Sequence, residues 1–111
     1  MSERADAARI DFLLKLITDT ENIALRHGGI EPALKDFEGH YALMMCCQQI
    51  GEILNKIENS AVAAKLPVQL AYRMRNIIAH DYLGIDIKQI ALTIQNDLPE
   101  LKIILNSLLQ R

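Results

Sequence analysis

The chain has 111 residues, of which 50% are hydrophobic and 23% are charged, and its formal net charge is −2. This balance excludes an intrinsically disordered chain, and the length predicts that residues 1–111 form one domain with a modest core. The slightly acidic charge argues against a broad basic surface for a long nucleic-acid duplex, but a small site for one or two phosphates remains compatible with it.

The composition is typical of a helical bundle. Aromatic residues make up 5% of the chain and Trp is absent, so the core must be built from Leu, Ile, Ala and Met. Cys46 and Cys47 are adjacent, which predicts two small buried hydrophobic residues rather than a disulfide framework or a metal site. Because we find neither a signal peptide nor a segment long enough to cross a bilayer, we expect a cytoplasmic protein without a membrane association.

The first half of the chain predicts two long helices and a short one. A helix over about residues 3–27 has mostly apolar residues at i, i+3, i+4 and i+7, and Gly28-Gly29 ends it. A short helix follows over about residues 32–37, with proline in its first turn. A second long helix over about residues 39–59 should pack antiparallel to the first, and Gly51 in its interior predicts a close helix crossing.

In the second half, Pro67 opens a third helix that reaches His80, and Leu83-Gly84 ends it. Two capping boxes, Asp86 with Gln89 and Asp97 with Glu100, then predict two further helices, one from about residue 86 to residue 96 and one that begins at residue 97. No segment alternates with period two, so strands are not expected. The predicted fold class is all-α, an up-and-down four-helix bundle with short extra helices. Apolar residues on more than one helix side indicate a homodimer.

The chemically richest segment is RNIIAHDY, which closes the third helix with Arg75, Asn76, His80 and Tyr82. Arginine binds phosphate through a planar, permanently charged fork, and histidine transfers protons near neutral pH. Together they suffice for RNA cleavage, in which the substrate supplies its own 2′-hydroxyl nucleophile. The structural alternative is that these cations complement the helix dipole at a C-terminus and that Tyr82 covers the end of the bundle.

Arg75 and His80 are five positions apart in the sequence, so on a regular helix they point about 140° apart. Two routes bring them to one phosphate. Either the helix loosens or ends near Ala79, or the site lies on a two-fold axis where the arginine of one subunit meets the histidine of the other. The second route also supplies two histidines, one for each proton transfer. Asn76 precedes His80 by four residues and can orient the imidazole.

The string RNIIAHDY, preceded by Ile50-Gly51-Glu52 in the second long helix and followed by Asp97-Leu98-Pro99, resembles the HEPN superfamily, and specifically its HepT-like toxins. The resemblance implies a metal-independent ribonuclease site at a homodimer cleft, with no cofactor, in which Arg75 and His80 are catalytic and Asn76 supports them. It further implies that Tyr82 accepts AMP from an MntA-like nucleotidyltransferase antitoxin.

The leading hypothesis is therefore a metal-independent ribonuclease toxin that is neutralised by AMP transfer to Tyr82. The alternative is a non-catalytic nucleotide-binding or adaptor subunit of a nucleotidyltransferase complex, which the acidic charge favours mildly. A plain helical dimerisation module is a third possibility, but it leaves the clustered polar residues unexplained. His27 is interpreted as a helix-end cation and His40 as a surface residue, because they lie too far from acidic pairs to indicate a metal site.

Overall fold

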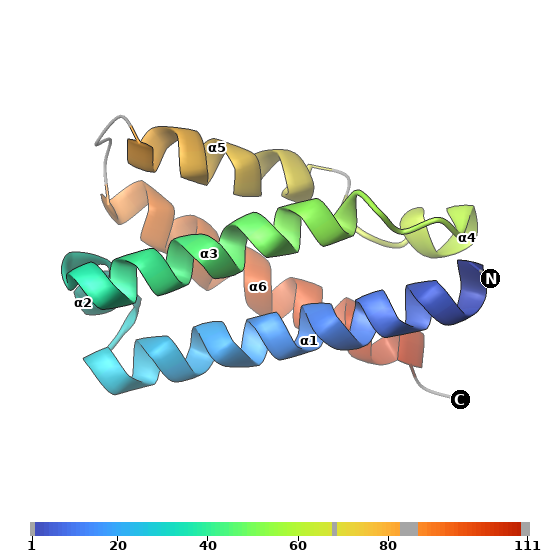
Figure 1. Cartoon of the computed structure of the whole chain (residues 1–111), viewed down its shortest axis with the longest axis horizontal. Helices are drawn as coiled ribbons and strands as arrows, with labels where there is room; N and C mark the ends of the chain where they lie inside the picture. Colours follow the sequence, from blue (N-terminus) through green and yellow to red (C-terminus); the bar gives the residue numbers. More distant parts are fainter. Residues whose placement is uncertain (1, 68, 83–86, 110–111) are drawn as a thin grey trace.

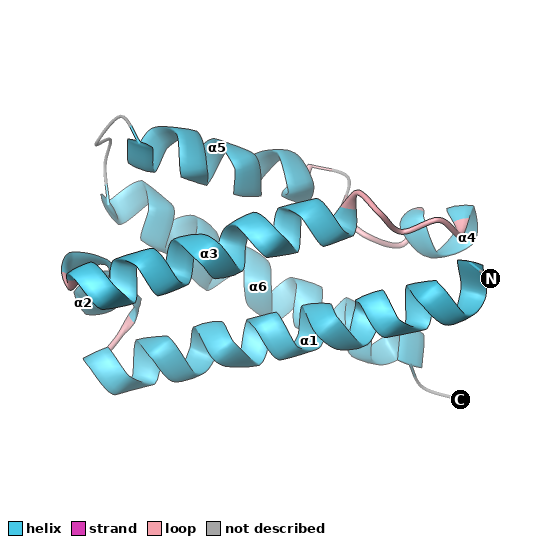
Figure 2. Cartoon of the chain, in the orientation of Figure 1, coloured by secondary structure: helices cyan, strands magenta, loops and turns pink. Residues whose placement is uncertain are grey.

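The computed structural model describes residues 2–67, 69–82 and 87–109, with side chains for residues 4–67, 69–79 and 87–109. Over these ranges the secondary structure is entirely helical (Figure 2). The helices are α1 (Ser2–His27), α2 (Ile30–Lys35), α3 (Phe37–Leu54), α4 (Ser60–Ala63), α5 (Leu70–Tyr82) and α6 (Ile87–Leu109).

The four long helices form an up-and-down bundle. α1 and α3 run antiparallel side by side, α5 lies along the other side of α3, and α6 crosses behind them (Figure 1). The chain direction reverses at each step from α1 to α3, α5 and α6, while α2 and α4 are short connections at opposite ends. The predicted all-α four-helix bundle with short extra helices is therefore confirmed.

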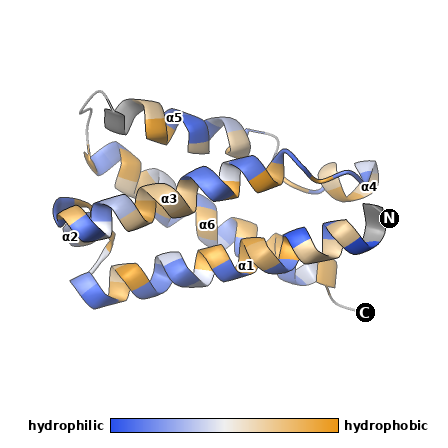
Figure 3. Ribbon diagram, in the orientation of Figure 1, coloured by the Kyte–Doolittle hydropathy of each residue, from blue (hydrophilic) through white to orange (hydrophobic). Residues whose placement is uncertain are grey.

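Each long helix contributes an apolar stripe to one continuous core. Polar and apolar residues alternate around the helices (Figure 3), as expected where a single face is buried. Among the described residues, the largest fully buried side chains come from α1, α3, α5 and α6, and they are Leu13, Ile17, Leu43, Cys47, Ile50, Leu70, Met74, Ile90, Ile94, Leu101 and Leu105. Cys46 and Cys47 are both buried and free, as predicted, and burial raises the pKa of the Cys47 thiol to about 12.

The α1–α3 connection is held by polar contacts around Asp36. Gly28 and Gly29 adopt positive φ angles and end α1, as predicted. The backbone N–H of Gly39 donates to Asp36 Oδ2 at 2.9 Å, so Asp36 caps α3. His27 Nε2 lies 3.2 Å from the same oxygen. His27 therefore links the end of α1 to the start of α3, which goes beyond the predicted role as a helix-end cation.

Two boundaries in the middle of the chain differ from the prediction. α3 ends at Leu54 rather than near residue 59, and the short α4 was not predicted. Asn59 explains the second difference, because its side chain accepts from the backbone N–H groups of Ala61 and Val62 and so begins a new helix. The third long helix begins at Leu70, slightly later than the predicted start at Pro67.

The predicted division at residues 96–97 is wrong, because α6 continues from Ile87 to Leu109 with Pro99 inside it. An interior proline removes one helical hydrogen bond and disfavours continuation. Here the buried residues of α6 keep the same helical spacing before and after Pro99. They are Ile90, Ile94, Leu98, Leu101 and Leu105. Burial of this unbroken stripe outweighs the lost bond. The predicted break at Leu83-Gly84 and the Asp86 cap lie outside the described residues.

Candidate functional site

Helix α5 carries the RNIIAHDY segment and packs directly on α3. The crossing is close because Gly51 faces α5: a Cβ atom at this position would lie 3.2 Å from Met74 Cβ and 3.5 Å from the Ala71 carbonyl oxygen. This confirms the predicted close crossing at Gly51. The buried face of α5 consists of Leu70, Ala71, Met74 and Ile77. These contacts fix the rotation of α5 and therefore the direction in which its polar residues point.

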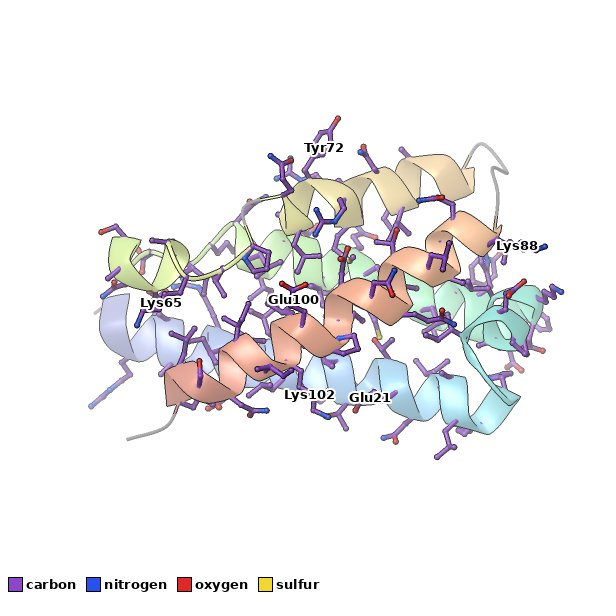
Figure 4. The ribbon with its side chains drawn as sticks, turned by 180° about the vertical axis from the view of Figure 1, so that it is seen from behind. Glu21, Lys65, Tyr72, Lys88, Glu100 and Lys102 are labelled. Atoms are coloured by element: carbon purple, nitrogen blue, oxygen red, sulfur yellow. The ribbon has the colours of Figure 1, made fainter. Side chains whose placement is uncertain are left out.

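The outer face of α5 presents Arg75 to solvent. Tyr72 and Arg75 are one turn apart, and both are exposed; Tyr72 is 60% exposed and projects away from the bundle (Figure 4). Among the described residues, no hydrogen bond or ion pair engages the Arg75 guanidinium. A guanidinium in this state keeps all five donors available to an anion.

The backbone of α5 bears on the first of the two routes considered for Arg75 and His80, in which the helix ends or loosens near Ala79. The helix is continuous from Leu70 to Tyr82, so it does not end at Ala79. Residues five apart on such a helix point about 140° apart. One copy of α5 therefore does not bring Arg75 and His80 to the same phosphate by unwinding. The side chains of His80 and Tyr82 lie outside the described residues.

Asn76 lies on the side of α5 that faces α6, and it is half-buried at a pocket between the two helices. The pocket has a volume of about 130 Å³. Its lining combines polar groups with two buried isoleucines, and consists of Arg73, Asn76, Ile77, Gln89, Ile90 and Thr93. Asn76 was expected to support the site, and the structure adds three polar neighbours of Asn76 that the sequence did not predict as part of it.

One of these neighbours forms an ion pair that sequence reasoning missed. Arg73 Nε donates to Asp97 Oδ2 at 2.8 Å, with the Asp97 side chain only 15% exposed. This contact connects α5 to α6 beside the pocket. Helical spacing does place Arg73 on the same side as Asn76, three residues apart. The local sequence predicts Asp97 as a helix cap and gives no indication of a partner in α5.

Two general properties concern the described residues as a whole. No group of three or more His, Cys, Asp or Glu side chains in these ranges has an arrangement suited to a metal ion. None of the helices in the described part of the chain combines the length and apolar character needed to cross a membrane.

An all-helical bundle with an Arg–Asn–His–Tyr segment on an exposed helix defines a class of HEPN-type proteins. The chain matches the family described as "Ribonuclease HepT-like" over residues 13–108. This match covers most of the chain, so the protein belongs to the HepT-like ribonuclease family, and ribonuclease activity is assigned at the level of that family. No curated protein and no solved structure matches the chain.

Proposed function

We propose that this protein is a metal-independent ribonuclease toxin that cleaves RNA in a cleft between two identical subunits. The observation that carries the proposal is the exposed Arg75 on an uninterrupted α5. Its charge has no protein partner among the described residues, and helical geometry directs it away from His80 of its own chain. A second copy of the helix supplies the missing histidine.

Two-fold symmetry gives this arrangement a simple geometry. If two α5 helices cross antiparallel near Ile77 and Ile78, position 75 of one lies next to position 80 of the other. Ala79 is exposed and small, so it permits two helices to approach closely at such a crossing. The cleft then contains two arginine–histidine pairs, one on each side of the two-fold axis, and each pair combines Arg75 of one chain with His80 of the other.

The outer face of α3 supports the same assembly. Phe37, Tyr41 and Met45 repeat every four residues along α3 and are 71%, 70% and 53% exposed. Because α3 and α5 pack against each other, this apolar stripe adjoins the face that presents Arg75. A second copy that covers both faces would bury these large apolar side chains, and it would also bring its own histidine to Arg75.

The chemistry follows from these positions. His80 of one chain accepts the proton of the ribose 2′-hydroxyl, and that oxygen attacks the phosphorus. His80 of the other chain donates a proton to the leaving 5′-oxygen, and Arg75 stabilises the additional negative charge on the phosphoryl oxygens. Asn76 supports the site from the same helix. The products are a 2′,3′-cyclic phosphate and a 5′-hydroxyl.

Control by a partner is the second part of the proposal. An MntA-like nucleotidyltransferase antitoxin transfers AMP from ATP to the hydroxyl oxygen of Tyr82, two residues after His80, and pyrophosphate leaves. The added group is bulky and anionic, so it blocks the cleft and repels the RNA phosphate. The acceptor role is tested by mass spectrometry of the protein after co-expression with the antitoxin, and Tyr82→Phe should remain unmodified and toxic.

The activity is tested with purified protein and RNA in the presence of excess EDTA. The wild type should cleave and leave cyclic-phosphate ends, and His80→Ala should leave the RNA intact. Induced expression should arrest growth only for the wild type at matched protein levels. Cleavage that requires a divalent ion, or that persists in His80→Ala, contradicts the proposal. Soluble dimer without cleavage or arrest in either form supports the alternative, a non-catalytic nucleotide-binding or adaptor subunit.

The shared cleft is tested with mixed dimers. Co-expression of wild-type and His80→Ala chains with different affinity tags allows the mixed dimer to be purified by two successive steps. If the general base and the general acid come from different chains, the mixed dimer should lose about 100-fold or more in cleavage rate. If each chain contains a complete site, the mixed dimer should retain about half of the wild-type rate.

A further inference from the structure

The pocket between α5 and α6 has the dimensions of a site for one planar ring. Its volume of about 130 Å³ is well below the roughly 300–1,000 Å³ of pockets that enclose drug-sized ligands. Ile77 and Ile90, which are 4% and 2% exposed, contribute apolar surface to it. A single ring can therefore lie against aliphatic side chains, whereas a whole nucleotide exceeds the available space.

The polar groups of this pocket match the edge of such a ring. The side chains of Asn76 and Gln89 each offer one acceptor and two donors. Within the described ranges, neither amide has a protein partner. Thr93 Oγ1 donates to the Gln89 carbonyl oxygen at 3.1 Å, which leaves the hydroxyl oxygen able to accept. Two open amides and one acceptor are the groups that recognise the hydrogen-bonding edge of a nucleobase.

Arg73 adds a planar cation that is already oriented. Its Nε donates to Asp97, whose side chain is largely buried, so the guanidinium is held at the pocket by a partner on the other helix. A guanidinium plane can stack on a nucleobase, and it can also pair with a phosphate. Orientation before binding reduces the entropy that a flexible arginine otherwise loses.

The pocket also lies at a suitable distance from the proposed chemistry. His80 follows Asn76 by four residues on α5, which corresponds to about 6 Å along the helix axis. A base in the pocket therefore belongs to a nucleotide beside the cleaved bond. From these observations we infer that the α5–α6 pocket binds a single nucleobase, and that it reads one base next to the cleavage position. The second statement rests on the proposed ribonuclease function.

The first arm of the test measures binding independently of cleavage. The side-chain amide signals of Asn76 and Gln89 are followed by NMR during titration with each of the four nucleoside 5′-monophosphates, and with ribose 5-phosphate as the ligand that lacks a base. Both amide signals should shift with at least one nucleotide, and ribose 5-phosphate should leave them in place. Equal shifts with ribose 5-phosphate, or no shifts with any nucleotide, overturn the inference.

The second arm measures sequence preference with a pool of randomised RNA. Gln89→Ala is compared with Gln95→Ala, the same change at another exposed glutamine of α6 that lies outside this pocket. The wild type and Gln95→Ala should favour one base at a position beside the cut. Gln89→Ala should reduce that preference about tenfold, with the other positions unchanged.

The two arms separate the failure of the pocket from the failure of the proposed function. If Gln89→Ala cleaves RNA with an unchanged base preference, the pocket does not read a base beside the cleavage position, whether or not free nucleotides bind. Nucleotide binding without any cleavage by the wild type supports the base pocket and removes the ribonuclease proposal. In that case the pocket holds the base of a free nucleotide, and its role in reading a cleavage position is removed.

Discussion

Two of the pockets in the described part of the chain, one at the α1–α4 end and one between α5 and α6, differ in how many of their polar side chains are already hydrogen-bonded to the protein. The pocket at the α1–α4 end has a volume of about 210 Å³ and is lined in part by Asp6 and Asn59. The α5–α6 pocket is smaller, at about 130 Å³. Volume does not distinguish a structural pocket from a binding site, so the two pockets are compared by the hydrogen bonds of their polar side chains.

At the α1–α4 end the polar oxygens are engaged by the protein. Asp6 is 2% exposed and accepts from the backbone N–H groups of Glu58 at 3.0 Å and Asn59 at 2.7 Å, and from Arg9 Nη1 at 2.9 Å. These bonds hold the segment that follows α3 against α1. In the α5–α6 pocket, by contrast, the amides of Asn76 and Gln89 have no protein partner among the described residues. Polar side chains whose hydrogen bonds are all made within the protein stabilise the fold. Polar side chains that point into one pocket without protein partners can bind a ligand.

The largest effect should come from Arg75→Ala. Removing a charge that stabilises the transition state should lower the RNA cleavage rate about 100- to 1,000-fold. Because Arg75 is exposed, the free energy of unfolding should change by less than about 0.5 kcal/mol. Initial cleavage rates and urea unfolding curves measure the two quantities. Arg26→Ala, at an exposed arginine in the last turn of α1, is the matched control and should affect neither.

Asp6→Ala should give the opposite result. It leaves the N–H groups of Glu58 and Asn59 without their acceptor, which should lower the free energy of unfolding by about 2–3 kcal/mol. The cleavage rate per folded molecule should stay the same. Asp19→Ala on the same helix removes only an exposed pair with Lys15 and should cost less than about 1 kcal/mol. Equal losses in the two variants would show that the buried carboxylate has no special role.

The same carboxylate predicts a dependence of stability on pH. Burial raises the pKa of Asp6, but the hydrogen bonds from Glu58, Asn59 and Arg9 lower it by more, so the pKa lies below its ordinary value of 3.8. A depressed pKa means that this contribution to stability is complete above the unfolded-state pKa and is lost as the pH falls through the folded-state pKa. Urea unfolding below about pH 4 should therefore show a smaller loss of stability in Asp6→Asn than in the wild type.

Much of the fold was predictable because helix periodicity and glycine positions are local signals. The end of α1 at Gly28 and the close crossing at Gly51 both follow from residue identity at one position. The candidate site was predictable in part for the same reason, since Arg75 and Asn76 belong to a compact string. Gln89 and Thr93 were not predictable as its neighbours, because their position depends on how α6 returns across α5.

Asp97 shows most clearly where a local signal misleads. An aspartate two residues before a proline and three before a glutamate has the pattern of a helix cap, and the capping box predicted a helix start there. In the structure this carboxylate is used for a contact with Arg73, twenty-four residues earlier in the chain. A partner at this distance in sequence leaves no trace in the spacing of nearby residues, and only the packed bundle shows which interaction prevails.

The smallest effect should come from this Arg73–Asp97 pair, and a double-mutant cycle can measure it. The arginine side chain is 42% exposed and the aspartate 15% exposed, so solvent screens the pair only partly. We expect a coupling energy of about 0.5–1 kcal/mol from urea unfolding of Arg73→Ala, Asp97→Ala and the double variant. Zero coupling would mean that the contact does not hold α5 to α6. A coupling in this range together with a weakened base preference in Asp97→Ala would show that the pair positions Arg73 for a ligand, because loss of stability alone does not change which base is preferred.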